Sequence, residues 1–124
     1  MSEKKLVLII DDDPDVLDSM KVALESNGFD TSTAMNGEEG LELASRIKPD
    51  FVFCDIMMER IDTGIDTAMK IREMYKNVPI YLLSDIGQIT SLNIDIYGCG
   101  LNGCVQKPIT SKEITSIVRH SVRS

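Results

Sequence analysis

Apolar residues in this 124-residue sequence do not gather into any long run. The run nearest the N-terminus, Leu6–Ile10, is too short for the hydrophobic core of a signal peptide. No stretch approaches the roughly 20 apolar residues that a membrane-spanning helix needs. We therefore expect neither a secretion signal nor a membrane span.

Cysteine is also scarce, and tryptophan is absent. The three cysteines, Cys54, Cys99 and Cys104, are odd in number and contain no C-x-x-C pair. This count and spacing argue against a disulfide framework and against a cysteine-based zinc site, and they favour a reducing, cytoplasmic environment.

Basic residues are outnumbered by acidic ones, 13 to 20, which gives a formal charge of −7. Such a balance opposes direct binding to nucleic acid and to anionic membranes, because both need Lys and Arg. The hydrophobic fraction of 43% is ordinary for a globular protein, so a packed core is expected. The length fits one domain, and we expect residues 1–124 to form a single unit.

Short apolar runs alternate with helical patterns along the chain. The first, third and fourth runs are continuously apolar, which is typical of parallel strands covered on both faces. The predicted strands are Leu6–Ile10, Phe29–Ala34, Phe51–Cys54, Ile80–Leu83 and a weaker Gly103–Val105. This alternation predicts an α/β fold, with a doubly wound parallel sheet and helices on both faces.

Capping signals mark three of the intervening helices. Asp13-Pro14 predicts a helix start, Asn36 with Glu39 resembles a capping box, and so does Thr110 with Glu113. A further helix is expected around residues 65–72, and a short or ragged one within 86–102. We expect the methionines, Met69 and Met74 among them, to serve as packing residues.

Polar side chains follow the predicted strands at the points where the strands end. In a parallel sheet these ends share one edge, so the side chains should converge there. Clustered carboxylates need a cation, and an all-oxygen donor set suits Mg²⁺, while a carboxylate can also accept a phosphoryl group. The residues concerned are Asp11, Asp12, Asp13, Asp55, Ser84, Asp85 and Lys107.

The sequence resembles a response-regulator receiver domain, a CheY-like family of two-component signalling, across nearly the whole chain. The resemblance rests on segments that match in order and spacing, and it implies strand order 2-1-3-4-5 and makes a cis Lys107-Pro108 bond plausible. The matching segments are Leu6–Asp15, Pro49–Met58, Val78–Ser84 and Lys107–Ile109.

The resemblance also implies roles for individual residues and partners. Asp55 would accept the phosphoryl group, with Ser84 and Lys107 completing the site. Asp11, Asp12, Asp55 and the backbone carbonyl of Met57 would hold Mg²⁺. The donor would be a sensor histidine kinase, a phosphotransfer protein or a small acyl phosphate. A phosphorylation-dependent shape change would alter binding to an output partner or drive homodimer formation, without metabolic enzyme activity.

Three positions depart from the family pattern and are expected to modulate its switch. Asp85 stands where a small residue is usual, Cys104 where an aromatic residue is usual, and Glu59 where proline is usual. The added carboxylate at Asp85 should repel an anionic donor. We therefore expect Asp85→Ala to speed phosphorylation by small donors.

Other functions fit the sequence less well. Asp85 and Cys104 motivate a receiver-shaped interaction module that does not use phosphate. The Asp11-x-Asp13 pattern superficially fits a haloacid-dehalogenase-type phosphohydrolase, but the chain is short for that fold. An EF-hand reading of the same acids is disfavoured because Val22 stands where glutamate is required. A flavodoxin-like flavin carrier would need a phosphate loop that three acids would repel.

Overall fold

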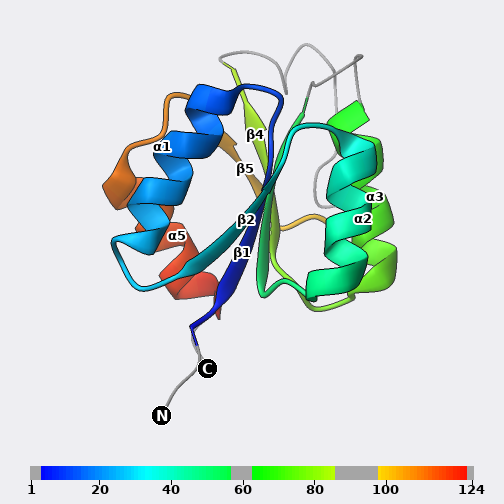
Figure 1. Ribbon diagram of the computed structural model, residues 1–124. Coiled ribbons are helices and arrows are strands. Elements are labelled where there is room, and N and C mark those ends of the chain that lie inside the picture. Colours follow the sequence, from blue (N-terminus) through cyan, green and yellow to red (C-terminus); the bar gives the residue numbers. More distant parts are fainter. Residues whose placement is uncertain (1–3, 57–62, 86–97, 123–124) are drawn as a thin grey trace.

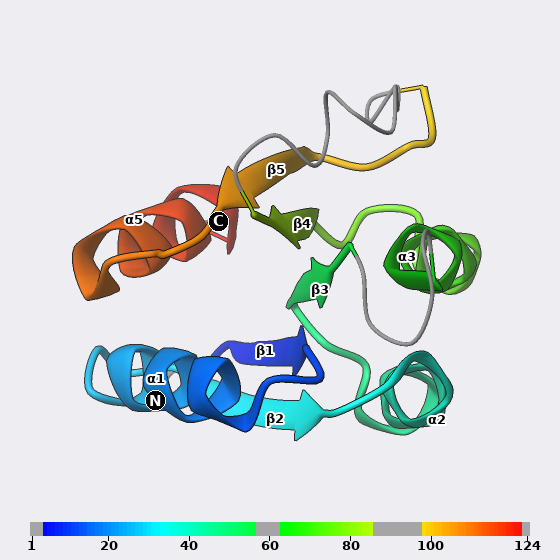
Figure 2. The same ribbon diagram turned by 90° about the horizontal axis from the view of Figure 1, so that it is seen from above.

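The computed structural model describes residues 4–56, 63–85 and 98–122, and within them the strands form one parallel sheet. Its order is β2-β1-β3-β4-β5, as the resemblance implies. Figure 2 shows this order across the middle of the molecule. The strands are β1 Leu6–Ile10, β2 Asp30–Ala34, β3 Phe51–Asp55, β4 Ile80–Ser84 and β5 Gly103–Gln106.

The helices cover the two faces of this sheet in pairs. In Figures 1 and 2, α1 and α5 lie on one face, and α2 and α3 lie on the other. The α/β doubly wound prediction is thereby confirmed. The helices are α1 Pro14–Glu25, α2 Gly37–Ile47, α3 Thr63–Met74 and α5 Ser111–Val122.

Two hydrophobic clusters, one on each face, hold the layers together. The cluster beneath α1 and α5 contains Phe51 and Phe53, whose ring centroids lie 4.6 Å apart. The cluster beneath α2 and α3 contains Cys54 and Ile71, both fully buried. Every residue of β3 is buried, as predicted from its continuous apolar run.

Side-chain caps fix where the helices begin. The Asp13 carboxylate accepts a hydrogen bond from the Asp15 backbone N–H at 2.9 Å. Asn36 accepts one from Glu39 N–H at 2.8 Å. Glu113 N–H donates to Thr110 Oγ1 at 3.1 Å, and Glu113 Oε1 accepts from that threonine, so the predicted capping box is present. These caps confirm the predicted helix starts.

The expectation that the methionines pack was wrong for Met69 and Met74. Both lie on the outer side of α3, where they are 42% and 43% exposed. Helical spacing alone does not identify which side chains of α3 face the sheet. The helix predicted within 86–102 falls largely outside the described residues, and residues 98–100 form a turn.

Candidate functional site

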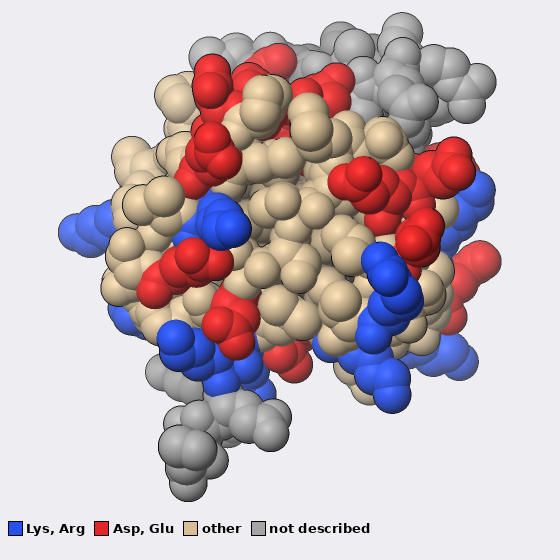
Figure 3. Space-filling view, in the orientation of Figure 1, with Lys and Arg blue, Asp and Glu red and all other residues tan. Residues whose placement is uncertain are grey.

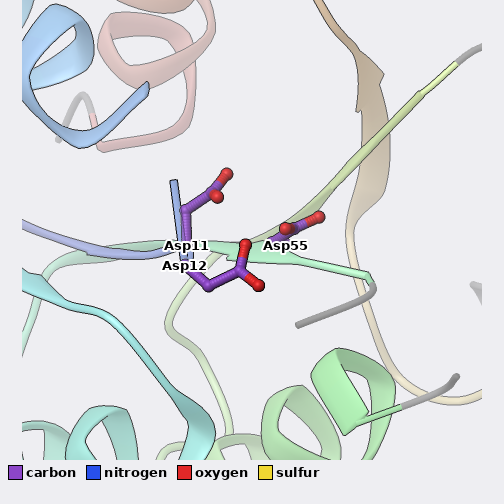
Figure 4. A group of neighbouring side chains, drawn as sticks. All are labelled: Asp11, Asp12 and Asp55. Carbon is purple, nitrogen blue, oxygen red and sulfur yellow. The ribbon is translucent and has the colours of Figure 1, made fainter. Parts of the chain in front are cut away.

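Three carboxylates meet at the carboxyl edge of the sheet, the edge where the strands end. Asp11 and Asp12 follow β1, and Asp55 is the last residue of β3. Figure 4 shows the three side chains around a common space, and one carboxylate oxygen from each lies within 4.8 Å of the others. Asp11 is fully buried, Asp55 is 5% exposed, and Asp12 is open to solvent. The predicted convergence of these acids is therefore present.

Lys107 brings the positive charge to this cluster. Its Nζ lies 2.8 Å from Asp11 Oδ2 and 3.5 Å from Asp55 Oδ2. Burial by itself lowers the pKa of Lys107, but the hydrogen bond to Asp11 and the charges of Asp11, Asp55 and Asp85 outweigh burial. The net effect raises that pKa above its usual value. The ammonium group therefore stays charged throughout the physiological pH range.

Backbone contacts hold these side chains in place. Asp11 N–H donates to Ala34 O at 3.0 Å, and Asp11 Oδ1 accepts from Asp13 N–H at 2.9 Å. Lys107 N–H donates to Ser84 O at 2.7 Å, which ties the residue after β5 to the end of β4. The Lys107-Pro108 peptide bond is cis. The site is thus built on strand ends rather than on long loops.

The donor set fits a hard divalent cation. The cluster offers only oxygen ligands, and in the described part of the chain the cation that pairs with it is Lys107, through Asp11 and Asp55. Among the described residues, the Lys107 ammonium group is the one donor that reaches the buried Asp11 Oδ2. Mg²⁺ prefers one or two carboxylates of this kind and retains water in its remaining positions. The third acid of the run, Asp13, instead caps α1.

The other predicted residues flank this cluster. Ser84 is 3% exposed, and its Oγ lies 3.2 Å from Cys104 Sγ. Asp85 is exposed, and its negative charge helps to raise the pKa of Lys107. Met57 and Glu59 lie outside the described residues.

Gly64, which the sequence analysis did not name as a site residue, lies against the end of β3. A Cβ on Gly64 would lie 1.6 Å from the backbone oxygen of Asp55, so no other residue fits there without movement. The signal in the sequence was the Asp62-Thr63-Gly64 run after β3. Gly64 lets the start of α3 lie directly on the end of β3.

Surface charge and helix composition complete the description. Asp and Glu side chains gather at the upper edge of the face in Figure 3, where the strands end. None of the helices in the described part of the chain has the length and apolar content to cross a bilayer.

Comparison with known proteins gives consistent relatives. The chain is 32% identical over 119 residues to the DNA-binding dual master transcriptional regulator RpaA of Synechocystis, covering 94% of this chain and 48% of that protein. It is 28% identical over 123 residues to the alkaline phosphatase synthesis transcriptional regulatory protein PhoP of Bacillus subtilis, covering 96% and 49% respectively. The chain therefore spans about half the length of these relatives.

Solved structures share the fold over nearly the full chain. A putative response regulator from Chloroflexus aurantiacus is 27% identical, with a TM-score of 0.86 and coverage of 98% of this chain and 100% of that one. The chemotaxis protein CheY4 of Vibrio cholerae matches with the same TM-score at 22% identity, with coverage of 96% and 99% respectively. The sequence model of the response regulator receiver domain family matches residues 7–119 of this chain. The chain therefore belongs to the response regulator receiver domain family.

Proposed function

We propose that this chain is a phosphoacceptor signalling domain, and that Asp55 receives the phosphoryl group. The observation that carries the proposal is the position of Lys107 Nζ, 2.8 Å from Asp11 and 3.5 Å from Asp55, beside a third carboxylate. A purely structural cluster would need fewer acids or more cations, because unpaired like charges repel.

The arrangement suits an in-line transfer. An oxygen of the Asp55 carboxylate attacks the phosphorus of the donor and forms a new O–P bond. The bond from phosphorus to the leaving group breaks, and the leaving group keeps the electron pair. Lys107 neutralises charge on one phosphoryl oxygen, and the Ser84 hydroxyl donates a hydrogen bond to another.

Asp11, Asp12 and Asp55 would hold Mg²⁺, with the Met57 carbonyl as a further ligand. When bound, the ion neutralises the negative charge that the acids and the phosphoryl group bring together.

The partners follow from the family and from the charge of the domain. A sensor histidine kinase or a phosphotransfer protein would supply the phosphoryl group. Two relatives are named as transcriptional regulators, and this chain spans about half of each. We infer that its output is carried by a separate effector domain or partner, since a net charge of −7 does not favour direct DNA binding. A cytoplasmic location and residues 1–124 as a single receiver domain belong to the same proposal, and phosphorylation-dependent homodimer formation is the alternative output.

The proposal is tested with acetyl phosphate and Mg²⁺ as the only reagents. Phos-tag electrophoresis and intact mass should show one phosphoryl adduct on the unaltered protein and none on Asp55→Asn. Asp50→Asn is the matched control, because Asp50 precedes the same strand at its opposite end and should leave the adduct unchanged.

Metal dependence is tested on two neighbouring acids. Asp12→Asn should raise the Mg²⁺ concentration for half-maximal rate about tenfold, while Asp13→Asn, which keeps the helix cap, should not. An adduct that persists in Asp55→Asn would contradict the assigned acceptor. No adduct from acetyl phosphate or from a phosphorylated histidine kinase would instead favour the phosphate-independent interaction module.

A further inference from the structure

The Ser84 hydroxyl has an unusual neighbour on the adjoining strand. Leu82 pairs with Cys104 and Ser84 pairs with Gln106, so Ser84 and Cys104 are diagonal neighbours on the same side of the sheet. Ser84 Oγ lies 3.2 Å from Cys104 Sγ, within hydrogen-bond distance for sulfur. In the described part of the chain, the thiol is the partner of this buried hydroxyl.

The main chain of Ser84 is already fixed. Its carbonyl accepts a 2.7 Å hydrogen bond from Lys107 N–H. The remaining freedom is rotation about the Cα–Cβ bond, which places Oγ, and rotation about the Cβ–Oγ bond, which decides where the hydroxyl proton points. A side chain that hydrogen-bonds to Oγ biases both rotations.

The thiol is able to serve as donor as well as acceptor. Burial raises the pKa of Cys104, and the hydrogen bond with Ser84 only partly offsets this increase. The sulfur therefore carries its proton at physiological pH and is available in either role.

We propose that Cys104 is a positioning residue for the Ser84 hydroxyl during phosphorylation of Asp55. When a phosphoryl oxygen is present, the hydroxyl donates its single proton to that stronger acceptor, and the thiol donates to Oγ. The resulting S–H···O–H···O–P chain strengthens each of its hydrogen bonds. This inference rests on the proposed phosphoacceptor function and adds to it how the hydroxyl is oriented.

A double-mutant cycle tests the coupling between the two side chains. Cys104→Val fills a similar space but has no donor or acceptor. It should slow acyl phosphate formation from acetyl phosphate about fivefold, the effect of one lost hydrogen bond. In the Ser84→Ala background the same change should alter the rate less than about 1.5-fold, because nothing remains to be positioned. Cys104→Ser should stay within about twofold of the unaltered protein, since a hydroxyl replaces both roles of the thiol.

Cys99→Val is the matched control. Cys99 is another half-buried thiol that packs against the same hydrophobic cluster, without a hydrogen bond to Ser84 in the described structure. The Cys99→Val variant should form the acyl phosphate at the unaltered rate. Equal slowing by Cys104→Val in both Ser84 backgrounds would show a packing role and overturn the inference, as would a Cys104→Ser variant as slow as Cys104→Val.

The S–H stretching band gives a readout that does not need phosphorylation. The infrared difference between the unaltered protein and Cys104→Ser isolates the band of this thiol, and Ser84→Ala should shift it. An unshifted band would overturn the inference even if Asp55 is phosphorylated. A protein that shows the shift but forms no adduct would instead contradict the proposed function.

Discussion

The two edges of the same sheet use aspartate in opposite ways. At the amino edge, where the strands begin, Asp50 Oδ2 accepts a 2.8 Å hydrogen bond from Leu6 N–H, and Asp50 N–H donates to Leu6 O. At the carboxyl edge, Asp11, Asp12 and Asp55 lie close together, and Lys107 pairs with Asp11 and Asp55. In the first arrangement a backbone N–H group donates a hydrogen bond to the carboxylate. In the second, several carboxylates lie close together and concentrate negative charge. We therefore expect Asp50 to stabilise the fold at the amino edge. At the carboxyl edge, repulsion among the three carboxylates should destabilise it.

The largest effect should come from the glycine that supports the carboxyl edge. Gly64→Ala puts a Cβ 1.6 Å from the backbone oxygen of Asp55, so a backbone segment must shift to make room. We expect a loss of about 3 kcal/mol or more in the free energy of unfolding, measured by urea titration. Gly28, in the turn before β2 at the amino edge, is the control. It has φ +91° with open space around it, so Gly28→Ala should cost only about 1 kcal/mol. Equal losses in the two variants would contradict the packing at Gly64.

Removing the amino-edge carboxylate should destabilise the fold without affecting the chemistry. Asp50→Ala leaves the Leu6 N–H without its partner and should lower the free energy of unfolding by about 1–2 kcal/mol. The rate of acyl phosphate formation should stay unchanged, because Asp50 lies at the opposite end of β3. If the fully folded Asp50→Ala variant formed the acyl phosphate more slowly, the amino edge would also affect the chemistry, contrary to this prediction.

The buried thiol of Cys54, the residue before Asp55 in β3, should make stability fall at alkaline pH. Burial, and then the charges of Asp55 and Asp11, raise the pKa of Cys54 well above its ordinary value of 9.0. Below pH 9 the thiol is protonated in both states. Above pH 9 only the unfolded chain loses that proton, so stability is lost as pH rises toward the folded-state pKa.

By pH 10 this loss should reach about 1.4 kcal/mol. Urea unfolding at pH 8 and pH 10 measures it, and Cys54→Val should reduce the fall by that amount. A variant with the same pH dependence as the unaltered protein would show that the thiol does not contribute.

Removing an acid at the carboxyl edge should stabilise the metal-free protein. The Asp12 carboxylate lies near those of Asp11 and Asp55, while the ion pairs of Lys107 within the described structure are formed with Asp11 and Asp55. Asp12→Asn should therefore raise the free energy of unfolding by roughly 0.5–1 kcal/mol at low salt. Asp13→Asn controls for the loss of negative charge at the start of α1. Saturating Mg²⁺ should abolish or reverse the gain, and a gain unaffected by Mg²⁺ would contradict a shared site.

The smallest effect concerns the approach of the phosphodonor. The Asp85 charge reaches Lys107, so it also reaches an anion arriving beside that residue. Asp85→Ala should speed phosphorylation by acetyl phosphate about two- to threefold at low salt, with less effect as salt is added. Initial rates from mass spectrometry measure the change. An unchanged or slower rate would indicate that Asp85 does not hinder the donor.

Local sequence patterns predicted much of the fold. The continuous apolar runs predicted central strands because a strand covered on both faces cannot alternate with polar residues. Asp13, Asn36 and Thr110 predicted helix starts because a cap is a contact between residues close in sequence. The positions of Asp11, Asp55 and Lys107 followed from one topological rule: parallel strands end at a common edge.

Tertiary structure decided what depends on register and on the path of the loops. Helical spacing did not show that Met69 and Met74 face solvent, because the orientation of α3 is set by its packing on the sheet. The contact of Gly64 with Asp55 and that of Cys104 with Ser84 join residues whose proximity no local pattern encodes. The sequence by itself determined which chemical groups reach the carboxyl edge. Only the packed sheet determined how deeply each is buried and which neighbour it contacts, because burial and pairing arise between segments far apart in the chain.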